Sequence, residues 1–176
     1  LARLESRTAA LLAEAQRDPL TGVANRGYTD SYLDQVFNAA LESNRAIGVI
    51  FADVDHFKQI NDNYGHAAGD AILQAMARCI GGSLRGGDFV GELTAVAERV
   101  RRNIADKRHS IGNGAVVPVT ISLGSSLLNR ARHKTPADLL GDADAALYAA
   151  KRAGRNRHYI SDGTVLRKHA ANDGCG

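Results

Sequence analysis

The 176-residue sequence has no tryptophan, three prolines and two cysteines. No apolar run reaches the roughly 20 residues of a membrane-spanning helix. The chain opens on Leu1 without a basic signal segment, so we expect a fragment whose natural start lies upstream and which does not itself enter a membrane. Cys79 and Cys175 show neither metal-ligand spacing nor a disulfide framework, which favours a reducing cytoplasm.

The net charge is small, at a formal value of +3, and aromatic residues make up only 5% of the chain. A nucleic-acid surface would need basic side chains gathered on one face and aromatic side chains for stacking. We therefore expect no nucleic-acid partner and instead predict a phosphorylated small molecule as the anionic ligand. The apolar content of 44% suffices for the core of one globular domain.

The first 17 residues have a helical pattern. Residues at spacings of three and four form an apolar seam: Leu1, Leu4, Thr8, Leu11 and Ala15. This seam predicts the C-terminal end of a coiled-coil stalk, although a single amphipathic helix lying on its own domain fits the pattern about as well. The pair Asp18-Pro19 should end the helix, because the residue before proline is driven out of the helical region.

The remaining chain alternates between two periodicities. Helical spacing predicts helices over 28–41, 69–80, 92–104 and 136–151. Apolar or alternating runs predict strands over 46–55 and 116–123, with a final edge strand at 157–160. Helices interleaved with buried strands indicate an α/β or α+β sandwich. Residues 161–176 read as a polar tail.

The first chemical signal is a pair of carboxylates at the end of a predicted strand. Asp53 and Asp55 are two residues apart, so both should point to one face, where a Mg²⁺ shared with substrate phosphates would offset their repulsion. An Asp-x-Asp alone is more often a helix cap or a solvated strand end. Lys58 adds a charge for phosphate, and Asn61 and Asp70 could read a purine edge. These residues favour a nucleotide site.

Gly65 and Gly69 bracket His66 in a predicted turn before a helix. We interpret His66 as a structural turn or packing residue, because nothing nearby marks it as a catalytic base.

Four segments in order carry a resemblance to a known family: DPLTGVANR at 18–26, DVDHFKQINDNYGHAAGD at 53–70, VTISLG at 119–124 and DADAALYAAKRAGRN at 142–156. The sequence resembles the GGDEF-domain diguanylate cyclases over residues 18–160. The resemblance implies a palm-type α+β fold, with a central mixed or antiparallel sheet flanked by helices. It also implies a bacterial homodimer, or a higher oligomer, that joins two GTP into cyclic di-GMP.

The resemblance also assigns roles to individual residues. Asp53 and the carbonyl of Val54 would hold Mg²⁺ or Mn²⁺, and Asp53 and Lys58 would be catalytic. The GTP-binding residues would be Phe57, Lys58, Asn61, Asp70, Leu73, Lys151 and Arg155. Within this set Asn61 and Asp70 read guanine, Leu73 lines the base pocket, and Lys151 and Arg155 reach the terminal phosphates. Asp55 and Asp62 match the motif but are expected to be structural hydrogen-bond partners.

The signature that names the family is missing. The segment Arg85-Gly86-Gly87-Asp88-Phe89 looks like a damaged copy, but its spacing fits the inhibitory product-binding motif that precedes the signature. Arg85, Asp88 and Arg99 would then bind cyclic di-GMP; the alternative for Arg85 to Asp88 is an ordinary turn before a helix. The signature hairpin, which supplies a further metal ligand, should lie between Gly91 and Glu92 and is absent.

Two explanations compete for this absence. Either the chain has lost the hairpin, or the 176 residues leave out a mobile hairpin that the gene encodes. We favour the second explanation, because losing two strands would expose the apolar faces of flanking helices. A true loss predicts an inactive relative that serves as a receptor for cyclic di-GMP or GTP, or as a docking module. A regulatory protein acting on the stalk is a further expected partner.

Overall fold

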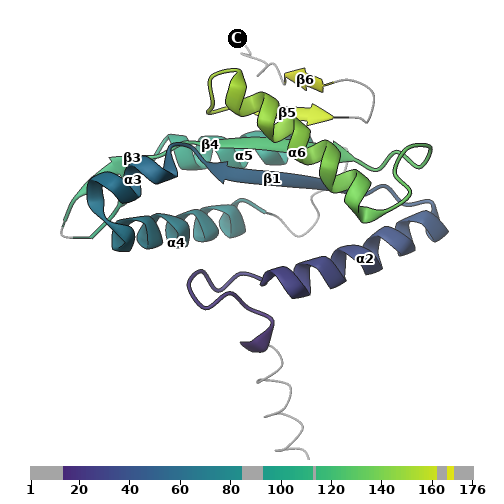
Figure 1. Cartoon of the computed structure of the whole chain (residues 1–176), viewed down its shortest axis with the longest axis horizontal. Helices are drawn as coiled ribbons and strands as arrows, with labels where there is room; N and C mark the ends of the chain where they lie inside the picture. Colours follow the sequence, from purple (N-terminus) through teal and green to yellow (C-terminus); the bar gives the residue numbers. More distant parts are fainter. Residues whose placement is uncertain (1–13, 85–92, 113, 162–165, 169–176) are drawn as a thin grey trace, which may run out of the picture.

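The computed structural model describes residues 14–84, 93–112, 114–161 and 166–168. Its helices are α2 (Arg26–Ser43), α3 (Phe57–Tyr64), α4 (His66–Ser83), α5 (Leu93–Ala105) and α6 (Pro136–Arg152). Its strands are β1 (Gly48–Val54), β2 (Arg108–Ser110), β3 (Val116–Pro118), β4 (Ile121–Leu127), β5 (His158–Ser161) and β6 (Leu166–Lys168). Figure 1 shows the main sheet between α6 on one face and α5 on the other.

The main sheet has the order β1-β4-β5-β6. Strand β4 pairs antiparallel with β1 and parallel with β5, and β6 pairs antiparallel with β5. A mixed sheet flanked by helices confirms the predicted α+β class. Within the described residues β1 has β4 as its one neighbour, so its other edge has no partner there.

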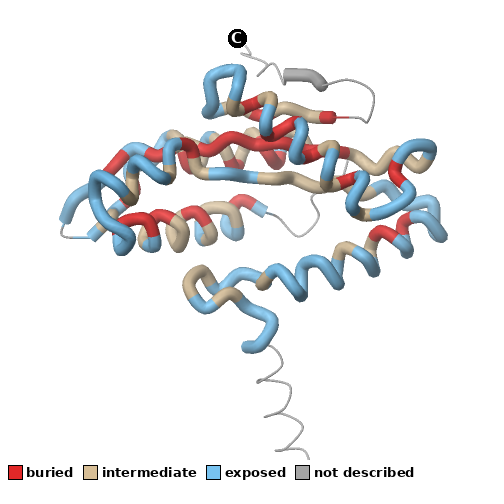
Figure 2. The backbone as a smooth tube through the Cα atoms, in the orientation of Figure 1, coloured by how far each residue is buried: buried red, intermediate tan, exposed pale blue. Residues whose placement is uncertain are grey.

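Strand β4 separates the two layers of the domain because its side chains alternate between them. Ile121 and Leu123 join the core cluster with Ile72 and Met76 of α4 and Val100 of α5. This apolar layer covers one face of the sheet, and Figure 2 shows its buried segments running along β4 and the inner side of α4.

On the opposite face, α6 lies directly on the backbone of β4. A methyl group added at Gly124 would overlap backbone atoms of Ala143 and Leu147. The helix begins with Pro136 and a capping box, in which Thr135 and Asp138 exchange side-chain and backbone hydrogen bonds. Hydrogen bonds from the backbone N–H groups of Thr135 and Lys134 lower the pKa of Asp138.

The N-terminal part of the chain meets the domain through a tight turn. Glu14 and Ala15 are helical, Gln16 lies in a turn and Arg17 forms a β-bridge with Ala24, while residues 1–13 of the predicted stalk lie outside the described residues. The carboxylate of Asp18 accepts hydrogen bonds from the N–H and hydroxyl of Thr21, at 2.8 and 2.6 Å, which lower its pKa. The predicted break at Asp18-Pro19 is confirmed.

Several boundaries differ from the sequence predictions. The predicted helices do not include Phe57–Tyr64, which form α3, and His66 begins α4 instead of occupying a turn. The predicted strand 116–123 is split into β3 and β4, and β2 was missed. Strand β5 is not an edge strand, because β6, within the predicted tail, pairs with it.

Candidate functional site

The candidate site begins where β1 ends. The ammonium of Lys151, in the last turn of α6, lies 2.8 Å from a carboxylate oxygen of Asp53. Their side chains are 35% and 48% exposed, so the pair contributes little to folding stability. The ion pair places the predicted metal ligand Asp53 next to Lys151, a predicted phosphate-binding cation.

Asp55 has a different role from Asp53. It is buried and accepts hydrogen bonds from the hydroxyls of Thr120 and Ser122, at 2.7 and 2.6 Å. A third comes from the backbone N–H of Asn156 at 3.0 Å. These donors reach both carboxylate oxygens, so Asp55 makes the structural hydrogen bonds that were expected of it.

The start of α3 supplies further groups of the candidate site. His56 precedes the helix in a left-handed conformation, with φ at 57°, and its carbonyl accepts from the N–H groups of Gln59 and Ile60. The N–H groups of Phe57 and Lys58 occupy the first turn, where an α-helix leaves its donors without intrahelical acceptors. Phe57 is half-buried and Lys58 is exposed. This end of α3 can therefore present N–H donors and an ammonium to an anion.

Asn61 and Gly69 form a closely packed contact between α3 and α4. The side-chain oxygen of Asn61 is buried and has no hydrogen-bond partner in the described structure. A methyl group at Gly69 would overlap this oxygen and would lie 3.1 Å from the Phe57 ring. Glycine at position 69 therefore leaves the room that Asn61 occupies. Asp70, the next residue, is exposed.

The remaining predicted residues are placed as follows. Leu73 lies on α4, one turn beyond Gly69, and is half-buried. Arg155 is exposed in the loop after α6. Arg99 donates from its Nε to the carbonyl of Ser83 at 2.8 Å, which ties α5 to the end of α4. Arg85 and Asp88 lie outside the described residues.

The available ligand atoms at the end of β1 decide whether a divalent metal ion would fit this site. Among the described residues no three His, Cys, Asp or Glu side chains cluster as ligands. Asp53 and the Val54 carbonyl would contribute two oxygens, and Mg²⁺ commonly completes its shell with substrate phosphates and water. The residues therefore fit a metal that arrives together with a nucleotide.

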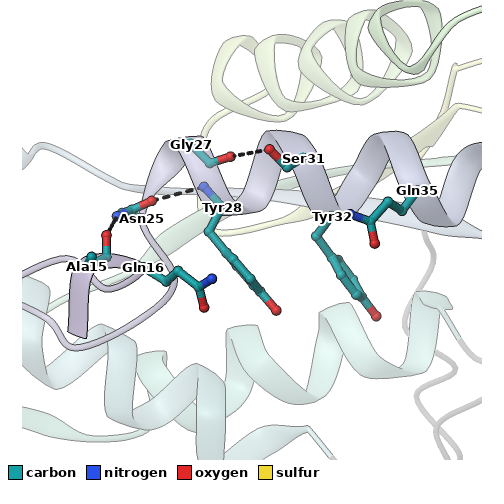
Figure 3. Close-up of a pocket in the computed structure, with 8 residues that line it drawn as sticks. All are labelled: Ala15, Gln16, Asn25, Gly27, Tyr28, Ser31, Tyr32 and Gln35. Carbon is teal, nitrogen blue, oxygen red and sulfur yellow. Dashed lines mark hydrogen bonds between the residues drawn. The ribbon is translucent and has the colours of Figure 1, made fainter. Parts of the chain in front are cut away.

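A separate pocket lies at the start of α2, away from these residues. It has a volume of about 540 Å³ and is lined by Ala15, Gln16, Asn25, Gly27, Tyr28, Ser31, Tyr32 and Gln35. Figure 3 shows the rings of Tyr28 and Tyr32 side by side; their centroids are 6.2 Å apart. None of the predicted site residues lines it.

Sequence reasoning missed the roles of Gly69 and Asn156. Gly69 was read only as part of a turn, and Asn156 only as the end of a motif. The signal for both was their position: Gly69 directly precedes Asp70, and Asn156 directly follows Arg155.

Comparison with known proteins agrees with the geometry. The family model described as "Diguanylate cyclase, GGDEF domain" matches residues 15–157. The diguanylate cyclase TpbB of Pseudomonas aeruginosa is 34% identical over 92% of this chain and 41% of its own length. The probable diguanylate cyclase DgcT of Escherichia coli is 33% identical over 84% of this chain and 36% of its own. The chain thus spans about two fifths of these relatives.

Solved structures give the same result. The coiled coil and GGDEF domain of DgcB from Caulobacter crescentus, in complex with c-di-GMP, has a TM-score of 0.82 at 26% identity, covering 91% of this chain and 93% of that one. SiaD of Pseudomonas aeruginosa, in complex with its activator SiaC, has a TM-score of 0.81 at 28% identity, covering 91% and 67%. Among the described residues no helix is long and apolar enough to cross a membrane. With the family model matching most of its length, the chain belongs to the GGDEF domain family.

Proposed function

We propose that this domain is a diguanylate cyclase, which condenses two GTP into cyclic di-GMP and two pyrophosphates. The observation that carries the proposal is the meeting of Asp53 and Lys151 at the end of β1. The buried, unpaired oxygen of Asn61 lies on α3, the helix that follows this strand end. One part of the site thus suits phosphate and metal, and the other suits a nucleobase.

In each condensation step, the 3′ oxygen of one GTP attacks the α-phosphorus of the other. The bond from that phosphorus to the bridging oxygen breaks, pyrophosphate leaves, and the hydroxyl proton passes to water. Lys58, Lys151 and Arg155 would hold the phosphate oxygens on which charge develops. Asn61 and Asp70 would orient guanine, with Leu73 against the base. A Mg²⁺ or Mn²⁺ at Asp53 and Val54 would supply Lewis-acid stabilisation.

Because each protomer offers one such site, joining two GTP requires two protomers facing each other. A homodimer is therefore part of the proposal, and residues 1–17 would hold it together and receive a regulatory partner. The named complex of SiaD with SiaC gives a precedent for a regulator within the family. Arg85, Asp88 and Arg99 would form an inhibitory site for cyclic di-GMP, the ligand named in the DgcB structure.

One observation favours a second candidate, an inactive receptor for GTP or cyclic di-GMP. The alignment with TpbB is 178 positions long but contains only 92% of this chain, which has 176 residues in all. TpbB therefore carries residues inside the aligned span that this chain lacks. This supports the absence of the signature hairpin from the 176 residues, and a protein without it would lack a metal ligand.

The test begins with a preparation whose intact mass shows whether residues are missing between Gly91 and Glu92. The protein is incubated with GTP and Mg²⁺, and the products are resolved by chromatography. We expect cyclic di-GMP from the unaltered protein and a loss of at least about 100-fold in Asp53→Ala, since a charged ligand of the transition state is removed. Asp62→Ala, a matched change at an exposed carboxylate, should retain turnover.

Full turnover by Asp53→Ala would overturn the metal assignment. Binding of GTP or cyclic di-GMP without any product would favour the receptor. If the protein neither turns over nor binds either nucleotide, both candidate functions fall.

A further inference from the structure

The loop between α6 and β5 has an unusual backbone. Gly154, Arg155 and Asn156 are consecutive residues with positive φ angles of 112°, 61° and 46°. For residues with a side chain this region costs on the order of 1 kcal/mol or more each. Such a conformation persists only when surrounding contacts impose it.

Two such contacts meet at Asn156, and they come from different elements. Its backbone N–H donates to Asp55, directly after β1, at 3.0 Å. Its side-chain oxygen accepts from Nη1 of Arg101, on α5, at 2.7 Å. Asn156 is therefore held by Asp55, at the end of β1, and by Arg101 of α5.

The contact from α5 is itself held in place. Arg101 also donates from Nε to Glu98 at 2.8 Å, and Arg102 donates to the same carboxylate. The hydrogen bond from Arg101 is the largest cause that lowers the pKa of Glu98 to about 2. The guanidinium that meets Asn156 therefore has a fixed orientation.

Arg155 lies in the middle of this loop, between the end of α6 and the start of β5. Its N–H donates to the carbonyl of Ala150 at 3.1 Å, and its own carbonyl accepts from Nε of Arg157 at 2.7 Å. The backbone that carries the Arg155 guanidinium is thus fixed by contacts on both sides. Four residues earlier, Lys151 contacts Asp53, so the loop leaves α6 at the candidate phosphate site.

We propose that Asn156 is a positioning residue, which sets the left-handed loop so that Arg155 is presented to the terminal phosphates of GTP. Asp55 and Arg101 act through Asn156 and do not touch the substrate. This inference rests on the proposed function, because it takes Arg155 as a phosphate-binding residue.

The test compares GTP with GMP, which lacks the terminal phosphates, by isothermal titration calorimetry in Mg²⁺ on the 176-residue protein. Asn156→Gly keeps a residue that tolerates positive φ but removes the bond to Arg101. We expect its affinity for GTP to fall about tenfold, because Arg155 would lose about one charge-assisted hydrogen bond to the terminal phosphates. Its affinity for GMP should stay unchanged. Asn156→Asp keeps an acceptor for Arg101 and should restore GTP binding. Arg155→Ala is the positive control and should lose GTP affinity to at least the same degree.

An equal fall for both nucleotides would show a merely structural role and would overturn the inference. Unchanged GTP binding in Asn156→Gly, with loss in Arg155→Ala, would overturn it while leaving the proposed function intact. If Arg155→Ala also binds GTP normally, the phosphate role of Arg155 is wrong and the inference falls with it. If the unaltered protein binds no GTP, the proposed function is wrong, and the inference that rests on it is overturned as well.

Discussion

At the proposed phosphate end of the candidate site polar side chains contact one another, whereas at the proposed base end the absence of a side chain at Gly69 makes room for the Asn61 side chain. Lys151 meets Asp53, and Asp55 and Arg101 meet Asn156. Asn61, by contrast, has a buried oxygen without a hydrogen-bond partner in the described structure, packed against Gly69. One end is set by charge and hydrogen bonds, and the other by shape.

The difference predicts different sensitivities. A buried acceptor without a protein partner costs free energy until a ligand donates to it, so the base end should gain most on binding. The base end should be sensitive to any side-chain volume added at Gly69, because that volume would displace Asn61. The phosphate end should tolerate changes of shape but respond to the removal of a charge. Three experiments test this contrast.

The largest effect is expected from Gly69→Ala. The added methyl group would displace Asn61, so we expect about 1–3 kcal/mol of lost stability and at least tenfold weaker binding of both GTP and GMP. Gly81→Ala is the matched control on the same helix, because a methyl group there meets nothing within 4 Å. It should bind normally and gain up to about 1 kcal/mol of stability. The measurements are thermal unfolding and calorimetric titration; equal behaviour of the two variants would contradict the packing argument.

An intermediate effect is expected from Lys151→Ala, which removes a cation whose side chain is 35% exposed. GTP affinity should fall about tenfold and GMP affinity much less, because the ammonium would bind the terminal phosphates. Without nucleotide, Asp53 loses its cation and should bind Mg²⁺ more tightly. Arg152→Ala is the control, since that neighbouring cation lies over the Tyr148 ring instead. Loss of GMP and GTP binding in equal measure would contradict the division between the two ends.

The smallest effect concerns pH. The pKa of Glu98 is lowered from 4.5 to about 2, so its carboxylate stabilises the fold fully above pH 4.5. This stabilisation, of order 1 kcal/mol, should disappear as the pH falls from 4.5 towards 2. The difference in Tm between the unaltered protein and Glu98→Gln should therefore shrink over that range. A difference that stays constant would mean that the ion pair with Arg101 does not contribute.

Much of the fold was predictable because periodicity reports burial. The predicted helix 136–151 and strand 46–55 lie within two residues of α6 and β1. Helix α3 was missed because its polar residues, NDN at 61–63, resemble a loop. Its apolar positions Phe57, Ile60 and Tyr64 nevertheless repeat at helical spacing. Strand β6 was missed because LRK, at 166–168, carries little apolar signal.

The candidate site was only partly predictable. Spacing along β1 suggested Asp53 as a ligand, and the resemblance supplied Lys151 from a helix about 100 residues away. Sequence alone could not reveal that the two would form an ion pair at 2.8 Å, because that contact depends on how α6 lies on the sheet. The role of Asn156 likewise depends on α5, whose side chains reach it only in the folded domain.

The bare backbone contact at Gly124 has a consequence for how far the site can drift. Leu147, whose backbone lies against that glycine, is one helical turn before Lys151. The absence of a side chain at Gly124 therefore sets how closely α6 approaches β4, and with it the position of the last turn of α6. Widening the gap by one methyl group would move the ammonium away from β1 without altering any residue that a nucleotide touches.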